Sequence, residues 1–114
     1  MVPAPSKAHQ WTPTYPQWRP SYVEDVLVVS MTLFNARDDV GYYEIQVLDS
    51  EFRPVPFATG ERIHQIDHLR RKVIDIYISS KDEDRAVYIC SRSKSLQGDR
   101  NVTVLSSRIC SKAK

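Results

Sequence analysis

Glycine is scarce in this chain, with three residues in 114. A glycine-rich loop that cradles a phosphate group is therefore excluded. Long apolar runs are also missing, and none approaches the roughly 18 residues of a transmembrane helix. The first 18 residues lack the apolar segment of a signal peptide, so if the protein is exported we expect its signal to have been removed.

Charge of one sign is not in excess over the whole chain, because 16 lysines and arginines stand against 14 aspartates and glutamates. This balance favours neither a nucleic-acid-binding class nor a membrane-binding class. The distribution is uneven, however, because from Arg85 onward there are seven basic residues and one acid, Asp99. The C-terminal quarter of the chain is therefore basic.

Residue patterns that carry chemistry are missing as well. No Ser-His-Asp order, phosphate loop or paired-carboxylate motif is present, so we predict no enzymatic activity and no cofactor. His64 and His68 have the spacing of two metal ligands on a helix, but they lie in a short polar stretch and we interpret them as exposed and unliganded. The basic cluster at 68–72 and the acidic stretch at 80–85 are interpreted as solvated loops.

Alternation of apolar and polar residues with period two dominates the chain after residue 22, and no long window has helical period. Turn signals recur about every 8–12 residues, which is typical of an all-β sandwich. The length of 114 residues makes one domain the default. The clearest strands are expected at 23–35, 42–49, 72–79, 85–93 and 101–109.

Five of the seven prolines lie in the first 20 residues, where they are interleaved with Trp11, Tyr15 and Trp18. Proline at this density forbids helix and favours extended chain. We predict an extended arm over 1–21 and one sandwich domain over 22–114. The arm is either a solvated leader or an element that lays its aromatic rings on its own sandwich or on a partner. We expect the three rings to contact a partner.

The two cysteines, Cys90 and Cys110, have no CxxC motif or clustered histidines beside them, which argues against a zinc site. Register decides whether they can form a disulfide between the strands of a hairpin. A two-residue turn at 98–99 would offset them by about 10 Å along the strand, which is too far. A loop at 99–101 would place them face to face. We favour the second register and a disulfide, and two buried free thiols are the alternative.

A local motif runs from Asp84 to Cys90, with the form Asp-x-Ala-x-Tyr-x-Cys. It resembles the tyrosine corner of immunoglobulin domains, in which the tyrosine lies two residues before a cysteine at the start of strand F. The resemblance implies that the ring of Tyr88 packs in the core and that its hydroxyl caps backbone at the preceding turn. It also implies a structural role for Asp84.

A longer match covers roughly residues 22–110. An asparagine, a polar turn, an aromatic-led strand, an aspartate turn and a Pro-Phe pair follow one another in the order Asn35, Tyr43, Val47, Asp49, Pro56 and Phe57. In this the chain resembles the N-terminal domain of periplasmic pilus chaperones of the PapD type. The resemblance implies an immunoglobulin-like antiparallel sandwich of about seven strands and a structural role for Asn35. Some chaperones of this group carry a cysteine pair joining strands F and G, where Cys90 and Cys110 would lie.

These observations predict a non-catalytic interaction or scaffold module of an extracytoplasmic bacterial assembly of the pilus, secretion or conjugation type. We expect a protein partner to add a strand at a sheet edge and Arg92, Lys94 and Arg108 to attract an acidic partner surface. A disulfide implies a periplasmic or extracellular location. The alternatives are an immunoglobulin-like cell-surface or viral binding domain and a nucleic-acid-associated protein that uses the basic C-terminal strand.

Overall fold

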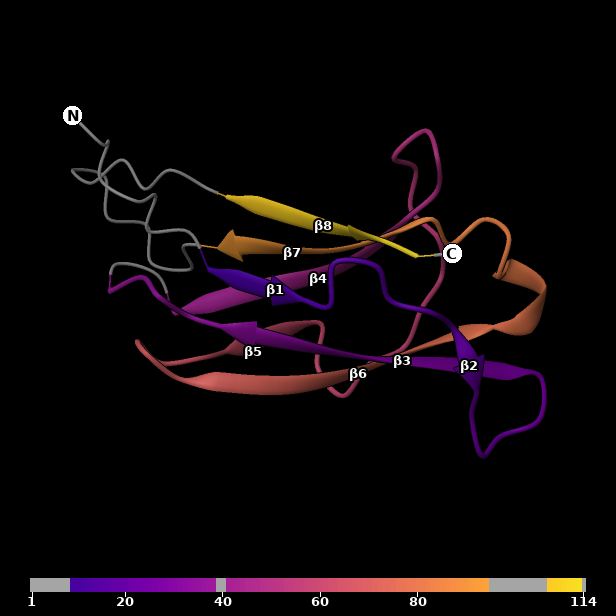
Figure 1. Ribbon diagram of the computed structural model, residues 1–114, viewed down its shortest axis with the longest axis horizontal. Coiled ribbons are helices and arrows are strands. Elements are labelled where there is room, and N and C mark those ends of the chain that lie inside the picture. The colour runs from indigo at the N-terminus through magenta and orange to yellow at the C-terminus, as the bar shows by residue number, and fades with distance from the viewer. Residues whose placement is uncertain (1–8, 39–40, 95–106, 114) are drawn as a thin grey trace.

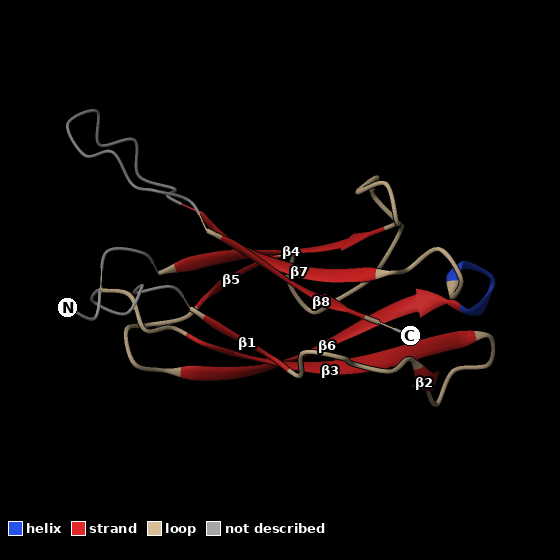
Figure 2. Cartoon of the chain, turned by 45° about the horizontal axis from the view of Figure 1, so that its top comes forward, coloured by secondary structure: helices blue, strands red, loops and turns tan. Residues whose placement is uncertain are grey.

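The computed structural model describes residues 9–38, 41–94 and 107–113. These residues form two antiparallel sheets that face each other as two layers (Figures 1 and 2). A single turn of 3-10 helix, η1 (Ser80–Asp82), follows the sixth strand. The strands are β1 (Gln10–Thr12), β2 (Arg19–Pro20), β3 (Val26–Phe34), β4 (Tyr42–Leu48), β5 (Ile63–Gln65), β6 (Arg71–Ser79), β7 (Tyr88–Lys94) and β8 (Arg108–Lys112).

Sheet A is built on β3, which pairs with β6 along one side and with both β1 and β2 along the other. Sheet B has the order β5-β4-β7-β8. The prediction of an immunoglobulin-like antiparallel sandwich is therefore confirmed, with eight strands in the described residues where about seven were expected. Two of the eight, β1 and β2, lie in the proline-rich segment where no strand was expected, and the short strand β5 lies in a polar stretch in which alternation is weak.

The core lies between the inner faces of the two sheets, as the period-two pattern predicts. Ile74, Ile76 and Ile78 of β6 alternate with exposed residues, and all three are buried. They meet Tyr43, Ile45 and Val47 of β4 in one apolar cluster. Each such side chain contributes about 1.5–3 kcal/mol when it leaves water, so this cluster is the main source of stability.

Residues 9–20, called the N-terminal segment below, belong to the sandwich, which corrects the prediction of a separate arm over 1–21. Trp11 of β1 is paired with Leu33 of β3, and its side chain is buried in the core. Trp18 is also buried in the core. It lies just before β2, in which Pro20 is paired with Leu27 of β3. Prolines exclude helix but not an edge strand, because an edge strand needs ladder hydrogen bonds on one side only.

Asn35 connects the end of β3 to its neighbours, and the expected structural role agrees with its contacts. Its side chain is fully buried and donates from Nδ2 to the carbonyl of Ile66 at 2.8 Å. Its Oδ1 accepts from the Tyr43 hydroxyl and, at 2.9 Å, from the Arg37 amide. This side chain therefore fixes the entry to β4 relative to β5.

Candidate functional site: the edge of strand β8

Strand β8 is the last strand of sheet B and is held to β7 by a disulfide. Cys90 and Cys110 lie directly opposite each other with a Cα separation of 4.0 Å, and the disulfide joins them. The register that we favoured from the sequence is therefore confirmed for the cysteines, and the alternative of two free thiols is excluded. The residues proposed for the loop, 99–101, lie outside the described residues, as does most of the strand expected at 101–109.

The direction of the backbone groups decides which side of β8 is open. In an antiparallel pair, residues whose Cα atoms approach most closely do not bond to each other and point their amides and carbonyls away. The short Cα separation makes Cys90 and Cys110 such a pair. The residues three positions further along agree, because an odd offset gives a bonded pair and Ser93 donates to the Ser107 carbonyl at 2.8 Å. Arg108 and Cys110 therefore direct their backbone groups to the outer edge of β8.

The N-terminal segment reaches β8 at both ends, because Ser107 Oγ lies 3.3 Å from His9 Nδ1 at the start of the strand. The amide of Lys112, the next outward-directed residue, donates to the Thr14 carbonyl at 3.2 Å. Within the described residues, no backbone partner takes the outward groups of Arg108 or Cys110. Backbone groups that point outward in this way could pair with an extended strand of another chain.

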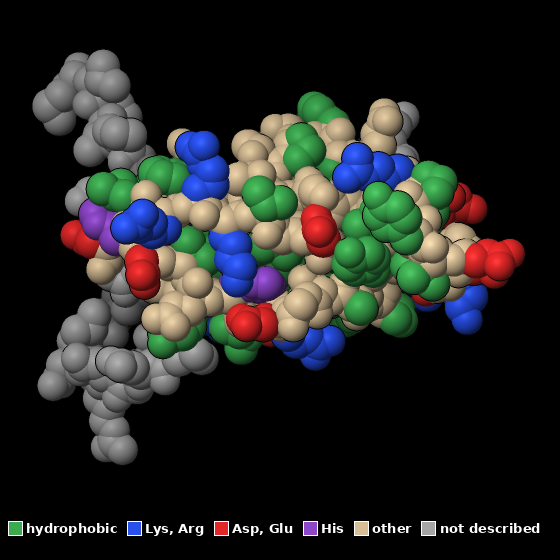
Figure 3. Space-filling view, turned by 90° about the horizontal axis from the view of Figure 1, so that it is seen from below, with side chains coloured by type: hydrophobic (Ala, Val, Ile, Leu, Met, Phe, Trp, Pro, Cys, Tyr) green, Lys and Arg blue, Asp and Glu red, His purple; other side chains and the backbone are tan. Residues whose placement is uncertain are grey.

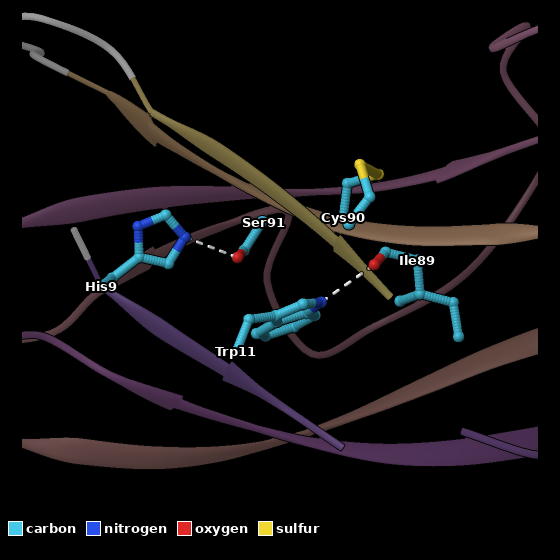
Figure 4. Close-up of a disulfide and its surroundings, with 6 residues drawn as sticks. His9, Trp11, Ile89, Cys90 and Ser91 are labelled. Carbon is cyan, nitrogen blue, oxygen red and sulfur yellow. Dashed lines mark hydrogen bonds between the residues drawn. A yellow bond between two sulfur atoms is a disulfide. The ribbon is translucent and has the colours of Figure 1, made fainter. Parts of the chain in front are cut away.

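His9 and Trp11 link the N-terminal segment to the inner side of β7 (Figure 4). Trp11 Nε1 donates to the Ile89 carbonyl at 2.9 Å, and His9 Nε2 lies 2.7 Å from Ser91 Oγ. Burial lowers the pKa of His9 from 6.5 to about 4, because the charged ring would lose its water. The disulfide lies on the opposite side of β7, so β7 is fixed from both faces (Figure 4).

The three basic residues singled out in the sequence lie together on the outer face of β7 and β8. Arg92 stands directly opposite Arg108, and both are exposed. Lys94 forms an ion pair with Glu44 of β4 at 3.6 Å. Glu44 also stands directly opposite Arg92, and neither Arg92 nor Arg108 forms an ion pair within the described residues. The three basic side chains outnumber this one carboxylate, so the face beside the open edge has a positive field that would attract acidic surfaces.

Of the three aromatic residues that we expected to contact a partner, two are buried and one is exposed. Trp11 and Trp18 are core residues, with Trp18 Nε1 donating to the Ala86 carbonyl at 3.1 Å, so they are not surface anchors. Tyr15 remains on the surface, with 72% of its area exposed. Of the three rings, Tyr15 alone is available to a partner, and nothing in the sequence pattern distinguished it.

Tyr88 does not pack in the core, which corrects the tyrosine-corner interpretation. Residues two apart on a strand share a face, so Tyr88 points outward with Cys90 while Ile89 points into the core. Its ring stacks on Phe52 with centroids 4.8 Å apart, and the guanidinium of Arg108 lies 5.6 Å from the Phe52 ring. The residue therefore extends the outer face beside β8.

Asp84 is exposed, and the structural carboxylate of this turn is Asp82 instead. Asp82 is buried and accepts from the Arg85 guanidinium at 2.6 Å. Its carbonyl accepts from the amides of Arg85 and Ala86. The motif from 84 to 90 thus marks the entry to β7 without supplying the contacts that the immunoglobulin pattern implies.

A polar hollow, which sequence reasoning missed, lies on the side of the sandwich opposite β8. His64 of β5 is buried rather than exposed, and neither ring nitrogen has a hydrogen-bond partner among the described residues. Burial, aided by the charge of Lys72, lowers the pKa of His64. The HxxxH spacing drew attention to this residue, but its short strand gave no sign of which way it points.

Within 9–38, 41–94 and 107–113, no group of three or more histidine, cysteine, aspartate or glutamate residues could hold a metal ion. The same residues contain no helix of the length and apolarity needed to span a bilayer.

The chain matches no family model and none of the curated protein sequences. Its structure is similar to that of the Escherichia coli chaperone DraB, with a TM-score of 0.66 and 18% identity over 92% of this chain and 52% of DraB. The chain thus spans about half the length of DraB. It is also similar to PapD-like domain 7 of human CEP192, with a TM-score of 0.53 and 8% identity over 100% of this chain and 90% of that domain. Likeness at such identities concerns the fold, and the fold of this chain is the PapD-like, immunoglobulin-like sandwich.

Proposed function

We propose that this chain is a non-catalytic protein-interaction module of an extracytoplasmic bacterial assembly, and that a protein partner pairs an extended strand with the outer edge of β8. The single observation that carries the proposal is the pair of outward-directed residues, Arg108 and Cys110, on a strand held in place by a disulfide. An edge of this kind is a template for another strand. The disulfide fits an oxidising compartment such as the periplasm or the cell surface.

The fold likeness to DraB, which is itself a chaperone, supports an interaction role over a catalytic one. The outer face beside β8 adds specificity, because Arg92 and Arg108 would attract a partner strand flanked by acidic side chains. Charges of this kind affect the association rate and its salt dependence more than the final affinity. We therefore infer a partner with an acidic surface around its pairing strand.

A substitution at Arg108 tests the proposal, because the amide of this residue faces the open edge. Proline at the first position of an edge strand removes that amide without breaking the ladder to β7. Arg108→Ala is the matched control, since it removes the same guanidinium but keeps the amide. Each tagged variant is produced in the native host, checked by thermal unfolding, and recovered with its bound proteins.

We expect wild type and Arg108→Ala to recover the same partner, with Arg108→Ala weakened more at low salt than at high salt. Arg108→Pro should remain folded and lose the partner. Retention of the partner by a folded Arg108→Pro variant would overturn the proposed binding mode. Recovery of DNA or RNA instead of protein, lost in both variants, would favour the nucleic-acid alternative.

A further inference from the structure

The side of the sandwich opposite β8 contains a hollow of about 410 Å³ between β5 and β6. Its floor is formed by residues that point inward, His64 of β5 with Lys72 and Ile74 of β6. Its rim is formed by the loop that carries Thr59 and by outward-pointing residues of β6. The hollow thus lies between two sheet edges, β6 of sheet A and β5 of sheet B.

The backbone of β6 is unpaired along this hollow. Tyr77 exchanges two hydrogen bonds of 2.8 Å with Ala58, so the backbone groups of Tyr77 point away from β3. Because the direction of the backbone groups alternates along the strand, the amides and carbonyls of Val73 and Asp75 also point away from β3. Neither residue has an outward backbone partner among the described residues. The edge of β6 is therefore open where it borders the hollow.

Two side chains that line the hollow, His64 and Thr59, carry buried polar atoms. Both ring nitrogens of His64 and the hydroxyl of Thr59 are buried and make no hydrogen bond within the described residues. A neutral imidazole offers one donor and one acceptor, and a hydroxyl offers both. Burying such groups without a hydrogen-bond partner is unfavourable, and a bound polar group would remove that penalty.

Charge in the hollow is mixed, because the ammonium of Lys72 is opposed by the carboxylates of Glu61 and Asp75. A free anion would meet these carboxylates, and a cation would meet Lys72. A neutral group that both donates and accepts suits the site better, and the side-chain amide of asparagine or glutamine has two donors and one acceptor carbonyl.

Apolar side chains lie beside the same edge on the outer face of sheet A. Val73 is 63% exposed and Tyr77 is 36% exposed. Figure 3 views the molecule from the β6 side and shows hydrophobic side chains lying in the open between basic and acidic ones. Tyr77 and Asp75 also line a second hollow of about 510 Å³ that continues across this face toward Tyr22.

From these observations we infer a second partner-binding site, in which an extended peptide pairs with Val73 and Asp75 of β6 and places an asparagine or glutamine side chain in the hollow at His64 and Thr59. The inference rests on the proposed function, because it gives the interaction module a second edge. Residues of the peptide on either side of the amide point outward, one opposite Val73 and the other opposite Asp75. The first can pack on Val73 and the second on its diagonal neighbour Tyr77, so both should be apolar.

The probe is a library of random nonapeptides displayed on phage and selected on the whole oxidised chain. We expect the enriched peptides to contain an asparagine or glutamine between two apolar residues. If the selection enriches no peptide, the inference is overturned. Enrichment of peptides without an amide residue would overturn the assignment of the hollow.

The backbone pairing is tested with Asp75→Pro, which removes an outward amide of an edge strand and leaves the ladder to β3 in place. Asp75→Ala is the control, because both variants lose the 2.6 Å hydrogen bond from Ser30. A synthetic peptide from the selection should bind wild type and Asp75→Ala and fail to bind Asp75→Pro. Equal binding by all three chains would overturn the pairing.

The polar floor is tested with Thr59→Val, which has nearly the same shape without the hydroxyl. The Thr59 hydroxyl has no hydrogen-bond partner among the described residues of the free protein, so its removal should leave the melting temperature of the protein unchanged or raise it. Affinity for the peptide should fall about tenfold, which corresponds to one lost hydrogen bond. Unchanged affinity would overturn the role of the hollow. Arg108→Pro should bind the peptide as wild type does, because this variant alters the edge of β8 and leaves β6 unchanged. This result would show that the two sites are separate.

Discussion

Arg92 and Arg108 face each other across β7 and β8, two residues along the ladder from the disulfide between Cys90 and Cys110. Like charges directly opposite each other on a sheet destabilise it. Three contacts offset this repulsion: the disulfide holds the strands in register, the Arg108 guanidinium lies over the Phe52 ring, and Glu44 of β4 stands opposite Arg92. The disulfide thus holds in place both the paired arginines and the open edge.

Reduction of the disulfide should lower the free energy of unfolding by about 3 kcal/mol, because the bond closes a loop between residues 20 apart. Urea unfolding with and without dithiothreitol measures this difference. The double variant Cys90→Ala with Cys110→Ala is the control, since its midpoint should not respond to the reductant. An equal midpoint for oxidised and reduced wild type would contradict the stabilising role.

A chain that begins at Tyr22 should not fold, because it lacks β1 and β2 and leaves Trp11 and Trp18 out of the core. Deleting a large buried aromatic side chain alone costs about 3–5 kcal/mol. Circular dichroism and thermal unfolding of the shortened chain test this. A shortened chain that melts cooperatively at the wild-type temperature would show that the N-terminal segment is a leader.

Acid should destabilise the fold through His9. Its pKa is lowered from 6.5 to about 4 in the folded chain by burial, so the neutral ring is the form that the fold favours. Stability is therefore complete above about pH 6.5 and decreases as the pH falls toward 4, by about 2 kcal/mol at most once local relaxation is allowed for. Urea unfolding at a series of pH values measures the slope.

His9→Gln should flatten that slope, because the variant has no proton to gain. The slope that remains is expected from His64, whose pKa is lowered in the same direction. His68→Gln is the matched control, since the side chain of His68 is exposed. If His9→Gln and His68→Gln show the same pH dependence as wild type, the buried ring has no part in acid sensitivity.

Asn35→Ala should lower the free energy of unfolding by about 3 kcal/mol, because it leaves the Tyr43 hydroxyl and the Ile66 carbonyl buried without this partner. Gln65→Ala is the control, since it removes an exposed amide side chain and should change stability by less than about 0.5 kcal/mol. Chemical denaturation compares the two. Equal effects would mean that Asn35 is replaceable.

The sequence was sufficient for the long strands and for the disulfide. Ile74, Ile76 and Ile78 alternate over nine residues of β6, and an inner face follows from that period. Cys90 and Cys110 could be paired because hairpin register allows few solutions. In both cases the structure is determined by residues close together in the chain, within one strand or one hairpin.

Other features depend on contacts between distant segments and could not be predicted in this way. Trp11 is buried by β7, far along the chain, and its three-residue strand is too short to show a period. The short motif around Tyr88 carries no information on which face of β7 turns inward. The burial of His64 likewise depends on β6 and the Thr59 loop closing over a strand of three residues.

Amide hydrogen exchange along β8 tests the central claim most directly. In the isolated chain, Ile109 and Ser111 should exchange slowly because they bond to β7, while Arg108 and Cys110 should exchange fast. When the recovered partner is added, Arg108 and Cys110 should become slow as well, because a strand then pairs with the outer edge. If both amides remain fast in the complex, or are already slow in the isolated chain, β8 is not the edge that receives a partner strand.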